Sequence, residues 1–218
     1  MKNTDLYRYE GWDEVVINPE DFQYVHLIED FISAEDLEKI QLFCSTAEYT
    51  ESSPLYPIES IHTCVDGYET ETTEILRKYR NKIYPILEQT YNCSINPESG
   101  HSEIVHIARY RPGTRLNEHA DKVCESWRDL SNVLYFNDDY KGGEIYFTQY
   151  GKEFKPKAGS LLIFPAAANF SHGVREITSG YRLATSTFWV VSEWKDMDYS
   201  NWESYLPISA VEDQSHNA

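Results

Sequence analysis

The chain has 218 residues, 41% of them hydrophobic and 25% charged, which is ordinary for one globular domain. Its 36 acidic and 19 basic residues give a formal net charge of −17, which disfavours a nucleic-acid partner because phosphate would be repelled. No apolar run is long enough to predict a membrane span and the start has no apolar signal segment, so we expect a cytoplasmic protein.

The first half of the chain predicts mainly helices. Residues 22–31 alternate enough to predict a strand, and Ser33 then begins a helix that continues to about residue 47. Residues 48–70 contain two prolines and a glycine among polar residues, so they predict a long loop and a candidate mobile lid. A second apolar stripe predicts a helix over residues 72–91, kinked or split at Pro85.

From residue 101 the pattern changes to short strands separated by turn residues. Strands at this spacing predict an antiparallel barrel or double-sheet jelly roll over residues 101–192. We therefore expect residues 1–218 to form a single α+β domain, with helical support from residues 22–100 packed on a jelly-roll or cupin-like core. Residues 193–218 are expected to be a tail.

Three residues form a candidate metal site. His119 and Asp121 are two apart, and such residues project to the same face of a strand, so both can reach one ion. His172 follows beyond three predicted strands. Two histidines and one carboxylate form the facial triad that suits iron(II) and leaves positions open for O₂. A structural zinc site would instead close four positions with protein ligands.

Arg182 is a candidate anion anchor beside this site. It follows His172 by ten residues, across a predicted hairpin turn at Ser179–Gly180. That hairpin would pair Arg182 near Arg175, roughly 10 Å along the strand from His172. A guanidinium at this range suits the far carboxylate of a five-carbon diacid that chelates the metal at its other end.

In this order of motifs the chain resembles the 2-oxoglutarate and iron(II)-dependent dioxygenases, in particular their prolyl-4-hydroxylase-like branch. The resemblance covers about residues 22–191. It rests on the triad with its basic residue and on four further segments, YVHLIEDFISAEDLEK (24–39), RYRPG (109–113), RDLSNVLYFNDDYKGGE (128–144) and KPKAGSLLIFP (155–165).

The resemblance implies cofactors and roles for further residues. It implies iron(II) at the triad, 2-oxoglutarate and O₂ as cosubstrates, and ascorbate (vitamin C) as a candidate reductant. Tyr110 and Tyr135 are implied to hold 2-oxoglutarate beside the basic residue, and Ser186 could add a hydrogen bond. Arg128 matches a substrate-side arginine of the family, and Trp189 is a candidate for the substrate mouth.

The implied activity is hydroxylation of an unactivated C–H bond with release of succinate and CO₂. A prolyl or other residue in a peptide or protein is the leading target, and the acidic charge adds basic peptides as a partner class. Two alternatives stay open: an oxygenase of a small molecule such as a free amino acid, and a cupin-like metal-binding protein without turnover. Leu116 and Phe188 stand where prolyl hydroxylases usually carry Tyr and Trp, which bears on the substrate rather than on the iron. The sequence predicts no oligomeric state.

Overall fold

The computed structural model describes residues 18–53, 56–65, 68–99, 106–124 and 127–195. Its helices are the α-helices α1 (Ala34–Thr46), α2 (Glu71–Tyr91) and α3 (Asp121–Cys124) and the 3-10 helices η2 (Pro19–Tyr24), η4 (Thr148–Tyr150) and η5 (Ala168–Phe170). None of the helices in the described ranges is long and apolar enough to cross a bilayer.

Two sheets form the core. The large sheet has seven strands in the order β1 (His26–Ile28), β13 (Leu161–Pro165), β9 (Leu130–Tyr135), β16 (Arg182–Trp189), β7 (His106–Tyr110), β3 (Tyr56–His62) and β2 (Thr50–Ser53). The small sheet has four strands in the order β12 (Lys152–Phe154), β11 (Ile145–Phe147), β14 (His172–Val174) and β8 (Leu116–His119). Three strand pairs complete the fold, β10 (Lys141–Gly142) with β15 (Ile177–Ser179), β17 (Val191–Trp194) with β6 (Cys93–Ile95), and β4 (Cys64–Val65) with β5 (Tyr68–Glu69).

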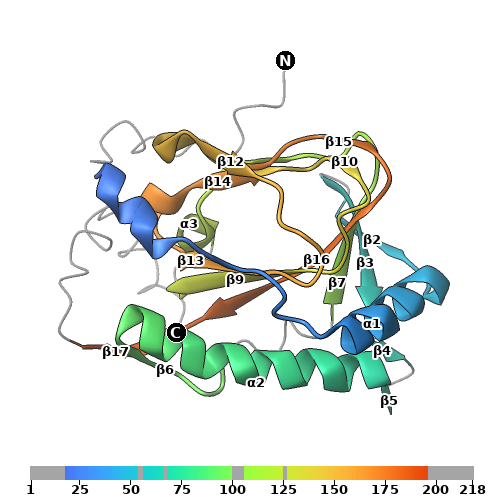
Figure 1. The fold of residues 1–218 in the computed structure, drawn as a ribbon, viewed down its shortest axis with the longest axis horizontal. Coiled ribbons are helices and arrows are strands. Elements are labelled where there is room, and N and C mark those ends of the chain that lie inside the picture. Colours follow the sequence, from blue (N-terminus) through green and yellow to red (C-terminus); the bar gives the residue numbers. More distant parts are fainter. Residues whose placement is uncertain (1–17, 54–55, 66–67, 100–105, 125–126, 196–218) are drawn as a thin grey trace, which may run out of the picture.

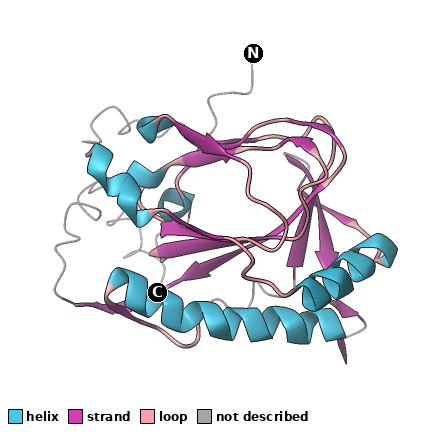
Figure 2. Cartoon of the chain, in the orientation of Figure 1, coloured by secondary structure: helices cyan, strands magenta, loops and turns pink. Residues whose placement is uncertain are grey.

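The two sheets stack face to face, and the long helices α1 and α2 cover the outer face of the large sheet (Figure 1). Figure 2 shows the same layers by element type, with α1 and α2 together on one side of the strands. This is the α+β fold with a jelly-roll core and N-terminal helices that the sequence predicted.

Both long helices begin at hydroxyl caps, of which the sequence predicted the one at Ser33. Ser33 Oγ accepts a hydrogen bond from the Asp36 amide at the start of α1, and Thr70 does the same for the Thr73 amide at the start of α2. The predicted split of α2 at Pro85 is wrong, because α2 runs as one helix of 21 residues. Its buried apolar face continues on both sides of the proline and holds the helix on the sheet.

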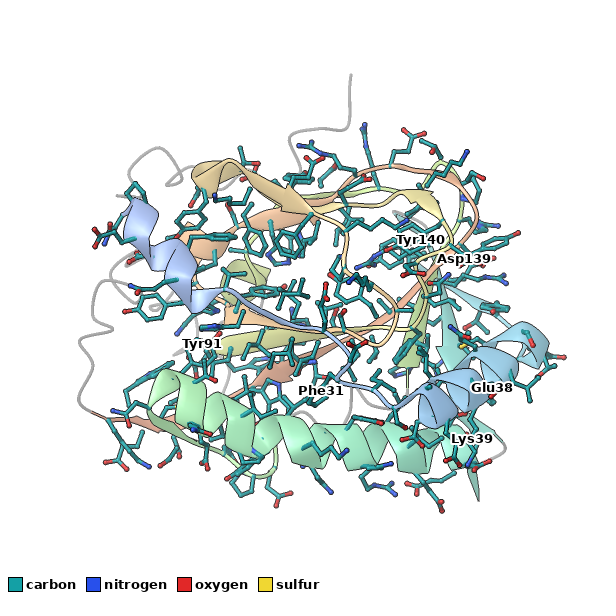
Figure 3. The ribbon with its side chains drawn as sticks, in the orientation of Figure 1. Phe31, Glu38, Lys39, Tyr91, Asp139 and Tyr140 are labelled. Atoms are coloured by element: carbon teal, nitrogen blue, oxygen red, sulfur yellow. The ribbon has the colours of Figure 1, made fainter. Side chains whose placement is uncertain are left out.

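The outer core lies between these helices and the large sheet. Alternate residues of the strands face the helices, and the cluster includes Ile40, Leu76, Tyr79, Ile83, Leu87, Ile61, Ile107, Leu130, Leu134, Ile163 and Trp189. Tyr91, labelled in Figure 3 at the end of α2, closes the cluster and donates its hydroxyl to the Tyr24 carbonyl. This close packing fixes the strands of the large sheet and thereby the residues on its opposite, interior face.

The inner core lies between the two sheets. The intervening residues of β9, β13 and β16 face inward and meet apolar residues of β11, in a cluster of Val133, Tyr135, Leu162, Phe164, Ala184, Ile145 and Phe147. The two-residue period of the strands therefore separates helix-facing from interior-facing side chains.

The long loop and lid predicted for residues 48–70 are wrong for the part that the structure describes. This segment contains β2 and β3, and β3 pairs with β7 from Ile58, opposite Tyr110, onward. Glu59 breaks the apolar pattern of β3 in the sequence, but it is buried beside Arg109 and Arg111 and forms ion pairs with both. Its partners lie about fifty residues later, so a local pattern does not reveal the strand.

Two further expectations need correction. The strand predicted over residues 22–31 is shortened to β1, because η2 occupies the first part after its cap at Asn18. The hairpin predicted at Ser179–Gly180 does not form, because β15 pairs with β10 whereas β16 pairs with β7 and β9. Gly180, at φ +75°, marks the point where the chain changes sheets, and Arg182 consequently lies opposite Tyr110.

Candidate metal centre

His119, Asp121 and His172 converge where the small sheet ends. His119 ends β8, and His172 opens β14 directly opposite it. Asp121 opens α3, so the pair lies on a strand-to-helix turn and not, as the sequence suggested, on one strand. The Nε2 atoms of His119 and His172 lie 3.4 Å and 3.9 Å from the carboxylate oxygens of Asp121. All three ligand atoms fall within 4.8 Å of one another. Since metals bind such donors at about 2 Å, the set fits one ion in a facial triad.

The backbone fixes which nitrogen of each imidazole faces the ion. His119 Nδ1 lies 2.9 Å from the Asn117 carbonyl, and His172 Nδ1 lies 3.1 Å from the Phe170 carbonyl. A carbonyl only accepts, so each Nδ1 carries the hydrogen. Nε2 of each ring is therefore the atom that offers its lone pair to a metal.

Asp121 is oriented by Ser131, a residue that the sequence reasoning missed. The Ser131 hydroxyl donates to Asp121 Oδ2 at 2.7 Å, and both side chains are buried. Burial alone would raise the pKa of Asp121, but His172, His119 and Ser131 outweigh it and hold that pKa below its usual range. The carboxylate is therefore ionised and ready to bind a cation.

Aromatic rings shield His172 from water. The Phe164 and Phe147 rings lie 4.7 Å and 5.6 Å from the imidazole, measured between centroids. Burial lowers the pKa of His172 to about 4, so the ring is neutral at neutral pH. Burial would also lower the pKa of His119, but Asp121 and the Asn117 carbonyl raise it above its ordinary value.

Arg182 lies on the inner face of β16 as a buried cation. It is 3% exposed, and its Nε and Nη1 atoms have no hydrogen-bond partner among the described residues. The guanidinium lies over the rings of Tyr110 and Tyr135, 4.5 Å and 5.0 Å from their centroids. Burial raises the pKa of Tyr135 to about 12, and its hydroxyl also lacks a partner. A buried guanidinium without hydrogen-bond partners indicates a binding site for an anion. A carboxylate fits because it can accept hydrogen bonds from both the Arg182 guanidinium and the Tyr135 hydroxyl.

These groups share one cavity of about 350 Å³. It brings together the triad, Tyr110, Arg182 and the predicted Ser186. Tyr135 lies beside it, within the reach of Arg182 described above. The interior is thus polar at the metal and at the guanidinium, with Val133, Ile145, Phe164 and Val174 among its apolar walls.

The side of the cavity near Arg128 is aromatic. The Arg128 guanidinium lies 3.7 Å from the centroid of the Phe188 ring, and its buried Nε has no partner among the described residues. Trp127 is 42% exposed and meets the edge of Phe188. The expectation that Trp189 borders the substrate mouth is wrong, because Trp189 is absent from the cavity lining. Its side chain points to the helices, is fully buried and donates to Asn132 Oδ1 at 2.7 Å.

Comparison with known proteins agrees with this geometry. Residues 105–191 match the model of the 2OG-Fe(II) oxygenase superfamily. A putative prolyl 4-hydroxylase of Acanthamoeba polyphaga mimivirus is 26% identical over 133 residues, covering 55% of this chain and 54% of that protein. Prolyl 3-hydroxylase 2 of Rattus norvegicus is 35% identical over 71 residues, which are 30% of this chain and 10% of that protein. The match thus spans about half of one relative and a small part of the other.

A solved structure shares the fold over most of the chain. The crystal structure of a Pseudomonas putida prolyl-4-hydroxylase superposes with a TM-score of 0.60 at 18% identity. The match covers 82% of this chain and 98% of that chain. At this identity the likeness concerns the fold alone.

Proposed function

We propose that this protein hydroxylates an unactivated C–H bond. The proposal is supported by the match of residues 105–191 to the model of the 2OG-Fe(II) oxygenase superfamily and by the similarity to prolyl 4-hydroxylases. The proposed target is a prolyl or other residue of a peptide or protein. The observation that carries the proposal is Arg182, a buried cation whose Nε and Nη1 have no partner in the described part of the chain, beside a triad of candidate metal ligands.

The residues fit the cofactors of such a reaction. His119, Asp121 and His172 would hold iron(II), and Arg182 with Tyr135 would hold the far carboxylate of 2-oxoglutarate. When bound, iron(II) and 2-oxoglutarate would use O₂ to supply the oxidant for hydroxylation, and succinate and CO₂ would be the other products. A zinc site that closes four positions is disfavoured, since the described residues contribute three ligands here.

The protein's own part is positioning and the exclusion of water. The two Nδ1 hydrogen bonds and the Ser131 hydroxyl fix the three ligands before any cofactor binds. Phe147 and Phe164 keep the metal-facing end dry. Tyr110 supports the guanidinium with the face of its ring, and Ser186 adds a hydroxyl to the cavity wall.

A peptide target is supported by the aromatic side of the cavity. Arg128 Nε has no partner among the described residues and suits a backbone carbonyl, and Phe188 and the half-exposed Trp127 offer flat apolar surface beside it. The names of the relatives point the same way, since they are prolyl hydroxylases. The acidic charge of the chain favours basic peptides among these.

The test is succinate release by the iron(II)-loaded protein with 2-oxoglutarate, screened over proline-containing peptides, other basic peptides and free amino acids. Peptide-dependent succinate, with a hydroxyl found on the peptide by mass spectrometry, is the expected result. Turnover with free amino acids alone would replace the peptide by a small-molecule substrate. Iron binding with no turnover on any of them would favour a metal-binding protein. Ascorbate would be tested as an added reductant.

A further inference from the structure

A third buried tyrosine hydroxyl joins the polar groups around Arg182. Tyr140 is 2% exposed, and its hydroxyl has no hydrogen-bond partner among the described residues. Tyr140 belongs to the same packed cluster as Tyr110, and the Tyr110 ring lies 4.5 Å from the Arg182 guanidinium. Burial raises the pKa of the Tyr140 phenol. Tyr140 packs with Tyr110 and Ile177 where the β10–β15 pair meets the end of the large sheet (Figure 3).

The fold holds this phenol in place from several sides. Lys155 lies over its ring, 4.2 Å from the centroid, and donates to the Tyr140 carbonyl and to the Asp138 carbonyl. Gly143, at φ +73°, follows the same turn, and a Cβ there would lie 2.8 Å from the Tyr140 ring. The absence of a side chain at Gly143 therefore makes room for the ring, and these contacts fix its position.

The unpartnered donors around Arg182 match the needs of one carboxylate. Arg182 offers Nε–H and Nη1–H, and Tyr135 and Tyr140 each offer a hydroxyl. A carboxylate has about four lone-pair sites, so it can satisfy all of these groups at once. Left without a ligand, each buried donor costs stability, so a cluster of four indicates a binding site rather than a packing accident.

Tyr110 contrasts with these two tyrosines. Its hydroxyl is not among the buried atoms that lack a partner, and its ring lies under the guanidinium. The rings of Tyr110 and Tyr135 both lie against the guanidinium, and the hydroxyls of Tyr135 and Tyr140 have no hydrogen-bond partner among the described residues.

We propose that Tyr140 is a further binding residue, which donates its hydroxyl to the far carboxylate of 2-oxoglutarate together with Arg182 and Tyr135. The inference rests on the proposed function and makes it more specific. Three donor groups at this end select an oxo acid that carries a second carboxylate over an oxo acid of the same length that lacks one.

The test compares two oxo acids in the iron(II)-loaded protein without O₂. 2-Oxoglutarate and 2-oxopentanoate have the same chain length, but only the first has a far carboxylate. Binding of each is followed by the visible charge-transfer band in the wild type and in Tyr140→Phe. We expect Tyr140→Phe to bind 2-oxoglutarate about ten-fold to a hundred-fold more weakly, the usual worth of a hydrogen bond to a charged group, and to bind 2-oxopentanoate unchanged. Tyr181→Phe, a half-exposed tyrosine next to Arg182, is the matched control and should behave as the wild type.

Thermal unfolding provides a second readout. Removing a buried hydroxyl without a partner should leave the melting temperature of the ligand-free protein equal or higher. The rise in melting temperature on adding 2-oxoglutarate should be smaller in Tyr140→Phe than in the wild type.

The outcomes separate the two proposals. Equal affinity of the wild type and Tyr140→Phe for 2-oxoglutarate would overturn the inference alone, and so would an equal loss for both oxo acids or a destabilised ligand-free variant. A wild-type protein that binds iron but neither oxo acid would overturn the proposed function itself.

Discussion

His119 and His172 lie directly opposite each other across the β8–β14 pair, with ring centroids 4.6 Å apart. Each ring is tied through Nδ1 to the carbonyl two residues before it. The two strands therefore present two matched imidazoles, and Asp121 completes the set from the turn that follows β8. The three candidate ligand atoms thus lie within 4.8 Å of one another.

The first prediction concerns the metal. Asp121→Ala and His172→Ala should each reduce iron(II) binding to near the detection limit, because each removes one of three protein ligands. The measurement is the visible band of the anaerobic protein with iron(II) and 2-oxoglutarate, together with iron content after gel filtration. His62→Ala, an exposed histidine on β3, is the control. Retention of the band in Asp121→Ala would remove this carboxylate from the metal site.

The second prediction concerns Ser131. Ser131→Ala should weaken iron(II) binding about ten-fold to a hundred-fold, because groups that orient a metal ligand typically have effects of that size. Ser131→Thr keeps a hydroxyl and should recover most of the affinity. Ser160→Ala removes another fully buried serine hydroxyl and serves as the control. Equal iron affinity in Ser131→Ala and the wild type would show that the hydrogen bond does not position Asp121.

The third prediction concerns Arg182. Arg182→Ala should raise the concentration of 2-oxoglutarate needed for half-maximal succinate release by about a hundred-fold or more, since it removes charged hydrogen bonds to a carboxylate. Arg182→Lys keeps the charge but loses the planar fork, so its defect should be smaller. Iron content should be unchanged in both variants. An unaltered requirement for 2-oxoglutarate would exclude Arg182 from the cosubstrate site.

The fourth prediction concerns pH and the helices. Hydrogen bonds from Lys78 and Tyr79 lower the pKa of Asp36 to about 2, from an ordinary value of 3.8. A carboxyl with a lower pKa in the folded state stabilises the fold above its ordinary pKa, and this stabilisation is lost as the pH falls through about 2. Asp36→Asn should therefore lower the melting temperature by a few degrees at pH 7. The difference from the wild type should shrink between pH 4 and pH 2.

The control for this prediction is Glu35→Gln on the same turn of α1, where the carboxylate is largely exposed. It should change the melting temperature little at either pH. A difference between wild type and Asp36→Asn that stays constant down to pH 2 would contradict the assigned role of the Asp36 carboxylate.

The sequence alone predicted those parts of the candidate site that depend on spacing along the chain. The triad and Arg182 carry distinctive side chains at fixed intervals, so a linear pattern reveals them. Ser131 and Tyr140 are an ordinary serine and one of 17 tyrosines, and their meaning comes from partners brought near by folding. The strand β3 was missed for the same reason, because Glu59 is buried only through ion pairs with residues distant in the sequence.

One error could have been avoided from the sequence. If Arg182 faces the interior of β16, the two-residue period also turns Ser186 and Phe188 inward and Trp189 outward. The cavity lining agrees with this alternation along β16, since it includes Phe188 and not Trp189. The sheet change at Gly180 was beyond such reasoning, because it depends on strand pairing with β10 and β7.

The metal ligands and the anion anchor come from opposite layers of the sandwich. His119 and His172 belong to the small sheet, whereas Arg182 and Tyr135 belong to the large one. A diacid bound at both ends would therefore link the two sheets and oppose their separation. Its binding would slow amide hydrogen exchange in strands of both sheets together, even in strands that do not touch it. Amide hydrogen exchange in the two sheets would thus be slowest once the cosubstrate is bound, before any substrate binds.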